Sequence, residues 1–120
     1  PDAALLAAWR GYQQAHRDYD AACARLPGGG TETDTAPLRR RIDAYQAKVE
    51  RLPARSVAGV AVKLRLLFAQ QLMTIDAHQA AIHDAPMTPE LAAEMDADDE
   101  ILWALIHDVE RMTTSKEASI

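Results

Sequence analysis

Cysteine, aromatic residues and long apolar stretches are all scarce in this chain of 120 residues. The single cysteine, Cys23, excludes an internal disulfide, and its position among apolar residues favours a buried thiol. Aromatic residues make up only 5% of the chain, whereas alanine is abundant, and this composition favours helix over strand. Lys63 and Arg65 interrupt the most hydrophobic stretch, so no segment reaches the roughly 18 apolar residues of a membrane span. We therefore expect a soluble, all-α protein of the cytoplasm that makes no contact with a membrane.

Motifs that bind metals, cofactors or phosphate groups are also missing. His78 and His83 are five residues apart, which places them on different faces of a helix, so they do not form a metal-binding pair. The segment 27–30 is rich in glycine but lacks the Lys-Ser/Thr ending of a phosphate loop, so it predicts a turn. We therefore predict no metal, no cofactor and no catalytic residue, and we favour a protein that is not an enzyme.

Apolar residues recur at helical spacing in several segments. In the first segment the large side chains step by four and three residues along one helix face, in a line formed by Leu5, Trp9, Tyr12, His16, Tyr19, Cys23 and Leu26. Proline and glycine end this helix, Pro37 fits the first turn of the second and Pro53 ends it. Thr88 and Pro89 begin the last helix. The predicted helices span residues 3–26, 37–52, 56–83 and 88–113.

Three long helices and one short helix predict an antiparallel bundle formed by a single domain, residues 1–120. The long third helix is apolar on more than one face, with Leu64 and Phe68 on its inward line, and this surface exceeds what the other helices of one chain need. Alanine recurs every seven residues in the first helix, at positions 8, 15 and 22, which lets another helix approach closely. We therefore expect a homodimer that completes a larger bundle, with a monomer as the alternative.

Charge is unevenly distributed along the chain, whose net charge is −5. Bases predominate in residues 38–65, whereas residues 84–110 contain acids but no lysine or arginine. The basic and acidic helices are expected to lie beside each other or to meet across a dimer. Alternatively, the acidic helix imitates a polyanion and inhibits a nucleic-acid enzyme, with Asp96, Asp99 and Glu100 as the candidate interaction surface. The basic segment lacks interleaved aromatic residues, which argues against direct binding of nucleic acid.

Two polar residues interrupt the apolar lines of the predicted helices. His16 lies between Tyr12 and Tyr19, and Asp98 interrupts the line of the last helix. A polar atom at such a position needs a partner or must reach the edge of the bundle. We predict that His16 and Asp98 form a polar pair that fixes the helix register, and a small polar pocket is the alternative.

Two segments resemble a known group of proteins. LPARSVAGVAVK (residues 52–63) and DAALL (residues 2–6) are similar to small all-helical proteobacterial proteins of unknown function, some of them products of prophages or other mobile elements. The resemblance covers most of the chain and implies no reaction, cofactor or catalytic residue. Together with the helical pattern it predicts a non-enzymatic interaction or accessory protein, which self-associates and presents a charged surface to a protein partner.

A second resemblance implies an enzyme. LRRRIDAY (residues 38–45) is similar to the first helix of the all-helical chorismate mutases, which place arginines and a lysine around a dicarboxylate substrate. In that case Arg39 or Arg41 would bind the substrate together with Lys63, through charged contacts. Pro53 ends this helix where the helix of the family continues, and the catalytic Glu and Gln of the family have no counterpart that we can identify.

Overall fold

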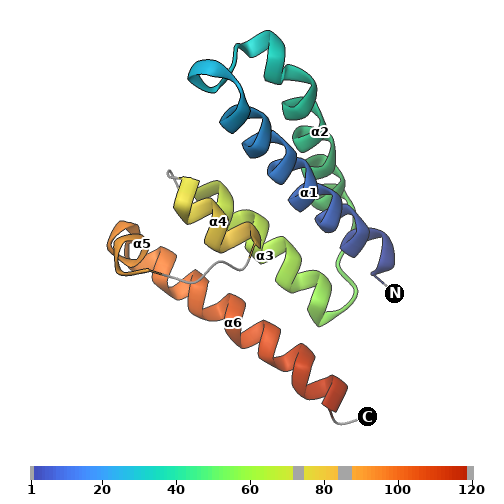
Figure 1. Ribbon diagram of the computed structural model, residues 1–120. Helices are drawn as coiled ribbons and strands as arrows, with labels where there is room; N and C mark the ends of the chain where they lie inside the picture. Colours follow the sequence, from blue (N-terminus) through green and yellow to red (C-terminus); the bar gives the residue numbers. More distant parts are fainter. Residues whose placement is uncertain (1, 72–74, 84–87, 119–120) are drawn as a thin grey trace. The chain divides into compact units, whose positions relative to one another are not determined.

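The computed structural model describes residues 2–71, 75–83 and 88–118, and within these ranges the chain forms helices and loops but no strand (Figure 1). The all-α prediction is therefore confirmed. The helices are α1 (Ala3–Arg25), the short 3-10 helix η1 (Pro27–Gly29), α2 (Glu32–Arg51), α3 (Val57–Gln71), α4 (Ile75–His83), α5 (Pro89–Glu94) and α6 (Ala97–Ala118). The chain divides into two compact units, one formed by Ala3–Pro53 and the other by Pro1–Asp2 with Ala54–Ile120. The prediction of one domain over residues 1–120 stays a prediction.

The first unit is a hairpin of α1 and α2, whose helices pack along each other (Figure 1). The predicted break after α1 is confirmed, because Gly28, Gly29 and Gly30 all have positive φ values that other residues rarely adopt. The two helices run in opposite directions and approach closely. A Cβ atom on Gly11 would lie 2.3 Å from a ring carbon of Tyr45, so a larger residue at this position would force the ring to move.

The second predicted helix begins five residues earlier than expected and is long rather than short. α2 starts at Glu32 because Thr31 forms a capping box with Asp34, in which each residue accepts a hydrogen bond from the other's backbone N–H. The Asp34 carboxylate accepts hydrogen bonds from the backbone N–H and the hydroxyl of Thr31, and these lower the pKa of Asp34. Pro37 lies inside the helix rather than at its first position. The predicted end before Pro53 is confirmed within one residue.

Part of the predicted apolar line of α1 forms the core of this unit. Leu5, Trp9 and Tyr12 are buried, and the rings of Trp9 and Tyr12 stack with their centroids 5.4 Å apart. The side chains further along the line, Cys23 included, are only half-buried. Three alanines spaced by seven residues, at positions 8, 15 and 22, are buried in this structure, so they do not form an open flank for another helix.

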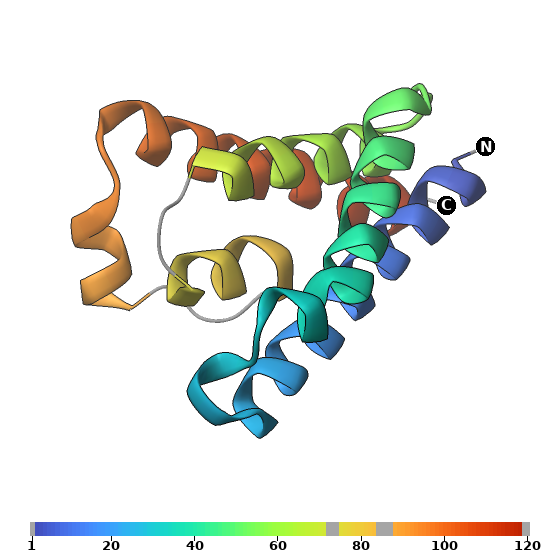
Figure 2. The same ribbon diagram turned by 90° about the horizontal axis from the view of Figure 1, so that it is seen from above.

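The predicted single helix over residues 56–83 is wrong, because two helices occupy this range and the chain reverses between them. Arg65 in α3 donates a hydrogen bond to the carbonyl of Ala81 in α4, at an N to O distance of 2.8 Å, so α4 folds back along α3 (Figure 2). Residues 72–74, between the two helices, lie outside the described residues. The predicted cap is confirmed, because the Ser56 hydroxyl accepts a hydrogen bond from the N–H of Gly59.

The predicted last helix over residues 88–113 is also divided. α5 begins after Thr88 with Pro89 as predicted, but the helix ends at Glu94, and α6 then starts after Asp96 and runs to Ala118. Asp96 and Asp99 accept hydrogen bonds from each other's backbone N–H, a second capping box that gives α6 its own beginning. α6 packs along α3, and the core of this unit contains the fully buried Phe68, Ile82 and Ile106.

Candidate functional site

The most unusual surface of the protein is apolar and lies on α3 and α6. Among the described residues, every large apolar side chain classed as exposed belongs to one of these two helices. On α3 these are Val60 (42% exposed) and Leu67 (46%), and on α6 they are Ile101 (67%), Leu105 (44%) and Met112 (58%). Val60 and Leu67 are seven residues apart, as are Leu105 and Met112, so each pair lies on one side of its helix. We refer to these five residues as the α3/α6 apolar face.

The two rows of this face lie side by side because α3 and α6 are antiparallel neighbours. Phe68 stacks on Trp103 with a centroid distance of 5.0 Å, and at the other end Val60 lines the same groove as Val109 and Met112. The groove has a volume of about 550 Å³. Leu67 lies two turns beyond Val60 on α3, and Leu105 lies two turns before Met112 on α6. Because the helices are antiparallel, the two steps point in the same direction in space. The rows therefore form one continuous two-helix surface.

The carboxylate of Asp2 accepts hydrogen bonds from the two polar residues that line this groove. The Asp2 side chain is 5% exposed and accepts hydrogen bonds from the backbone N–H of Arg55, at 3.0 and 3.1 Å, and from the hydroxyl of Ser56. The hydrogen bond from the Ser56 hydroxyl lowers the pKa of Asp2 most, and the hydrogen bond from the backbone N–H of Arg55 acts in the same direction, although burial opposes both. Arg55 and Ser56 also line the groove, so Asp2 fixes the segment from which α3 starts.

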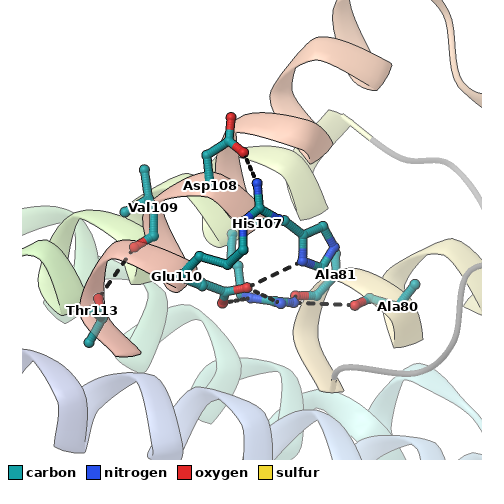
Figure 3. A network of polar contacts seen from close by, with 9 residues as sticks. Ala80, Ala81, His107, Asp108, Val109, Glu110 and Thr113 are labelled. Carbon is teal, nitrogen blue, oxygen red and sulfur yellow. Dashed lines mark hydrogen bonds and ion pairs between the residues drawn. The ribbon is translucent and has the colours of Figure 1, made fainter. Parts of the chain in front are cut away.

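Arg65 connects three of the helices of this unit, α3, α4 and α6. Its side chain is almost fully buried, and its Nε and Nη2 donate to the two carboxylate oxygens of Glu110, at 2.7 and 2.9 Å. Its Nη1 donates to the carbonyls of Ala81 and Ala80 near the end of α4, at 2.8 and 3.4 Å. Figure 3 labels Ala80, Ala81 and Glu110, the residues whose oxygens accept these hydrogen bonds. This position stabilises a guanidinium because the backbone carbonyls near the C-terminus of a helix lack partners within the helix and carry partial negative charge.

Aromatic rings cover the same ion pair. The Trp103 ring lies 5.5 Å from the guanidinium of Arg65, and His107 packs edge-on against Trp103 at 4.4 Å. The Nδ1 of His107 is 3.7 Å from Glu110, a longer contact than those of Arg65 (Figure 3). Because the donors of Arg65 point to Glu110 and to backbone carbonyls, this cluster fits a structural role better than substrate binding. From the sequence we used Arg65 as an interruption of the most hydrophobic stretch and as part of the basic segment, but did not predict the ion pair. A charged residue among large apolar residues is a signal of such a buried pair.

The predicted polar pair is divided between the two units. His16 lies in α1, is half-buried and packs edge-on against Tyr12 with a ring distance of 4.6 Å. Asp98 is exposed in the first turn of α6. The contact between His16 and Asp98 therefore stays a prediction.

The acidic candidate surface lies at the start of α6. Asp96 and Glu100 are exposed and Asp99 is half-buried. Asp96 and Asp99 are engaged with each other in the capping box, so their first role is to begin the helix. Glu100 and the neighbouring Asp98 extend the acidic surface.

The predicted anion-binding residues come from both units. Arg41 is exposed on α2 and forms an ion pair with Asp18 of α1 at 3.2 Å. Arg39, on the same helix, is half-buried, and Lys63 is half-buried on α3. Their convergence on one ligand stays a prediction. Within the residues that the structure describes, no group of three His, Cys, Asp or Glu side chains is placed to hold a metal ion. In the same part of the chain, every helix is too short or too polar to cross a membrane.

No protein-family model matches the chain, and neither a curated protein nor a solved structure is significantly similar to it. The two resemblances drawn from the sequence therefore stay predictions, and the function is inferred from the surfaces described above.

Proposed function

We propose that this chain is a non-enzymatic helical interaction protein, which self-associates and presents a charged surface to a protein partner. The observation that carries the proposal is the α3/α6 apolar face. Single exposed apolar side chains are common on monomeric proteins and need no explanation. A continuous apolar surface on two packed helices, in contrast, is typical of sites that bind another protein.

The energy available from this face is consistent with association. Burying an apolar side chain that starts about half exposed contributes about 1 kcal/mol, so five residues from each of two chains contribute about 10 kcal/mol. Association costs roughly 4 to 15 kcal/mol in lost freedom of motion. At the low end of this cost about 6 kcal/mol remains, so the face alone supports weak association. Charged contacts at its edge determine which partner and which register are favoured.

Sedimentation equilibrium of the purified chain tests the self-association. We expect the average mass to rise from that of one chain to that of two as the protein concentration increases, with the midpoint at tens of micromolar or above, the dissociation constant to which about 6 kcal/mol corresponds. A mass of one chain at every concentration up to the solubility limit would contradict the proposal.

The charged surface is tested separately, by charge reversal at the start of α6. Asp98 and Glu100 are the suitable positions because both are exposed, whereas Asp96 and Asp99 form the capping box. We expect Asp98→Lys with Glu100→Lys to abolish capture of a protein partner from the host lysate and to leave the circular dichroism signal unchanged. Ala47→Lys, at an exposed position of α2, is the control. Equal capture by both variants would remove the acidic surface from the proposal.

A further inference from the structure

We infer that the α3/α6 apolar face binds the same face of a second copy of this chain, closing an antiparallel four-helix bundle around a two-fold axis parallel to the helices. This inference rests on the proposed self-association and assigns it a surface and a register. Rotation about such an axis places α3 of one copy opposite α6 of the other. It does not shift any residue along the length of the bundle. Each helix then has two antiparallel neighbours, the usual arrangement of a four-helix bundle.

The chemistry of the face selects a second copy as its occupant. An apolar surface is best covered by another apolar surface, and all the exposed large apolar side chains of the described residues lie on this face. A symmetric dimer is therefore the arrangement in which one copy offers the other a matching surface. The outer side of α2 also carries exposed bases, Arg40, Lys48 and Arg51, but its exposed apolar residues between them are alanines. If the α3/α6 apolar face of one copy bound α2 of another, the bases of α2 would match the acids of α6, but the large apolar side chains of the face would be poorly covered.

Charges at the two edges of the face match each other across the proposed axis. Lys63 comes three residues after Val60, on the side of α3 that faces away from α6. Asp108 is exposed on the outer side of α6, where it also forms an ion pair with Arg111 of the same helix. Val60 shares a groove with Val109 and Phe68 stacks on Trp103. Counting along the antiparallel helices from either contact places Lys63 level with residues 106–108 of its own chain.

The two-fold rotation keeps this level and exchanges the helices, so Lys63 of each copy lies opposite Asp108 of the other. The dimer therefore contains this pair of opposite charges twice, once at each edge of the apolar contact. This match of charge accompanies the apolar match and favours a second copy over an unrelated apolar surface.

The test is the dissociation constant of the full chain, measured by sedimentation equilibrium for the wild type and for variants of the face. Leu67→Glu and Leu105→Glu each place two charges in the proposed contact of a dimer, and we expect either to raise the dissociation constant at least about 100-fold. Ala47→Glu introduces the same charge at an exposed position of α2 and should change the dissociation constant less than about threefold. Both positions of the face are almost half exposed, so folding of the variants is expected and is checked by circular dichroism and thermal unfolding.

The outcomes separate this inference from the proposed function. A wild-type chain that stays monomeric contradicts both. A dimeric wild type whose dissociation constant is unchanged by Leu67→Glu and Leu105→Glu overturns the inference alone, because self-association then uses another surface. A dimer that Ala47→Glu weakens as much as the two face variants do also overturns the inference. Loss of the dimer in the two face variants, with the control unchanged, is the result that supports it.

Discussion

Arg65 is a charged residue at a position whose neighbours in the sequence are apolar. The structure explains it through two partners, the carboxylate of Glu110 and the carbonyls near the end of α4. A guanidinium can donate to both at once because its donors point in fixed, divergent directions. One side chain thereby connects α3, α4 and α6, which explains why a charge is retained in the core of this unit.

The two members of this ion pair should respond differently to substitution. Glu110→Ala leaves the buried guanidinium without its counter-charge, and we expect a loss of about 3 kcal/mol in the free energy of unfolding. Arg65→Met fills the same space with an apolar side chain, and Glu110, whose side chain is 35% exposed, can turn to water, so we expect a loss of less than about 1.5 kcal/mol. Urea unfolding of both variants measures the difference. Equal losses would show that the ion pair does not act as we describe.

Tyr12 predicts how stability depends on alkaline pH. Burial raises its pKa to about 12, and the nearby charges of Asp43 and Glu50 act in the same direction. The unfolded chain ionises this tyrosine near pH 10, whereas the folded chain keeps it neutral. The contribution is therefore fully present below pH 10 and is lost as the pH rises towards 12, by about 2 to 3 kcal/mol in all.

Urea unfolding of the wild type and of Tyr12→Phe between pH 8 and pH 11 measures this effect, because phenylalanine cannot ionise. We expect the wild type to lose stability more steeply than the variant above about pH 10. Parallel pH profiles for the two proteins would contradict a raised pKa of Tyr12.

At the scale of the helices, the capping boxes decide where α2 and α6 begin. Asp96→Ala removes the side chain that accepts the N–H of Asp99, and we expect a loss of about 1 kcal/mol. Asp98→Ala, two residues further along, removes only a favourable charge near the helix N-terminus and should cost about 0.5 kcal/mol. Thermal unfolding of the two variants gives the comparison. A larger effect at Asp98 would contradict the assignment of Asp96 as the cap.

Helix ends were predictable from the sequence where the backbone itself is restricted. The glycines at 28–30 and Pro53 limit the dihedral angles or remove a donor, so the ends of α1 and α2 were correctly predicted. The start of α2 was missed because Thr31 and Asp34 act through side-chain hydrogen bonds in a segment without apolar periodicity. The division between α3 and α4 involves neither glycine nor proline, and the apolar pattern continues through residues 72–74.

The candidate site was predictable only in part, for a similar reason. The third predicted helix was expected to be apolar on more than one face, and Leu67 does remain exposed, whereas Val62 and Leu66 are buried. The exposure of Val60 was not predicted. The sequence did not show that α6 adds a second apolar row beside them. That information depends on the pairing of Phe68 with Trp103 and of Arg65 with Glu110, which are distant in the sequence.

At the scale of the whole molecule, the proposed function depends on the α3/α6 apolar face, and the register of its contact provides the most direct measurement. Lys63→Asp places like charges opposite each other in its own dimer, and so does Asp108→Lys. A mixed dimer of the two variant chains restores opposite charges at both edges. At one edge the introduced aspartate of the first chain faces the introduced lysine of the second, and at the other edge the native Lys63 faces the native Asp108.

Native mass spectrometry of an equimolar mixture of these two variants distinguishes the mixed dimer from the two homodimers by mass. We predict that the ratio of mixed dimer to homodimers exceeds its statistical value by about tenfold, as expected when like charges are replaced by opposite ones. A statistical mixture of dimers, or dimers of each variant alone as stable as the wild type, would contradict the proposed interface.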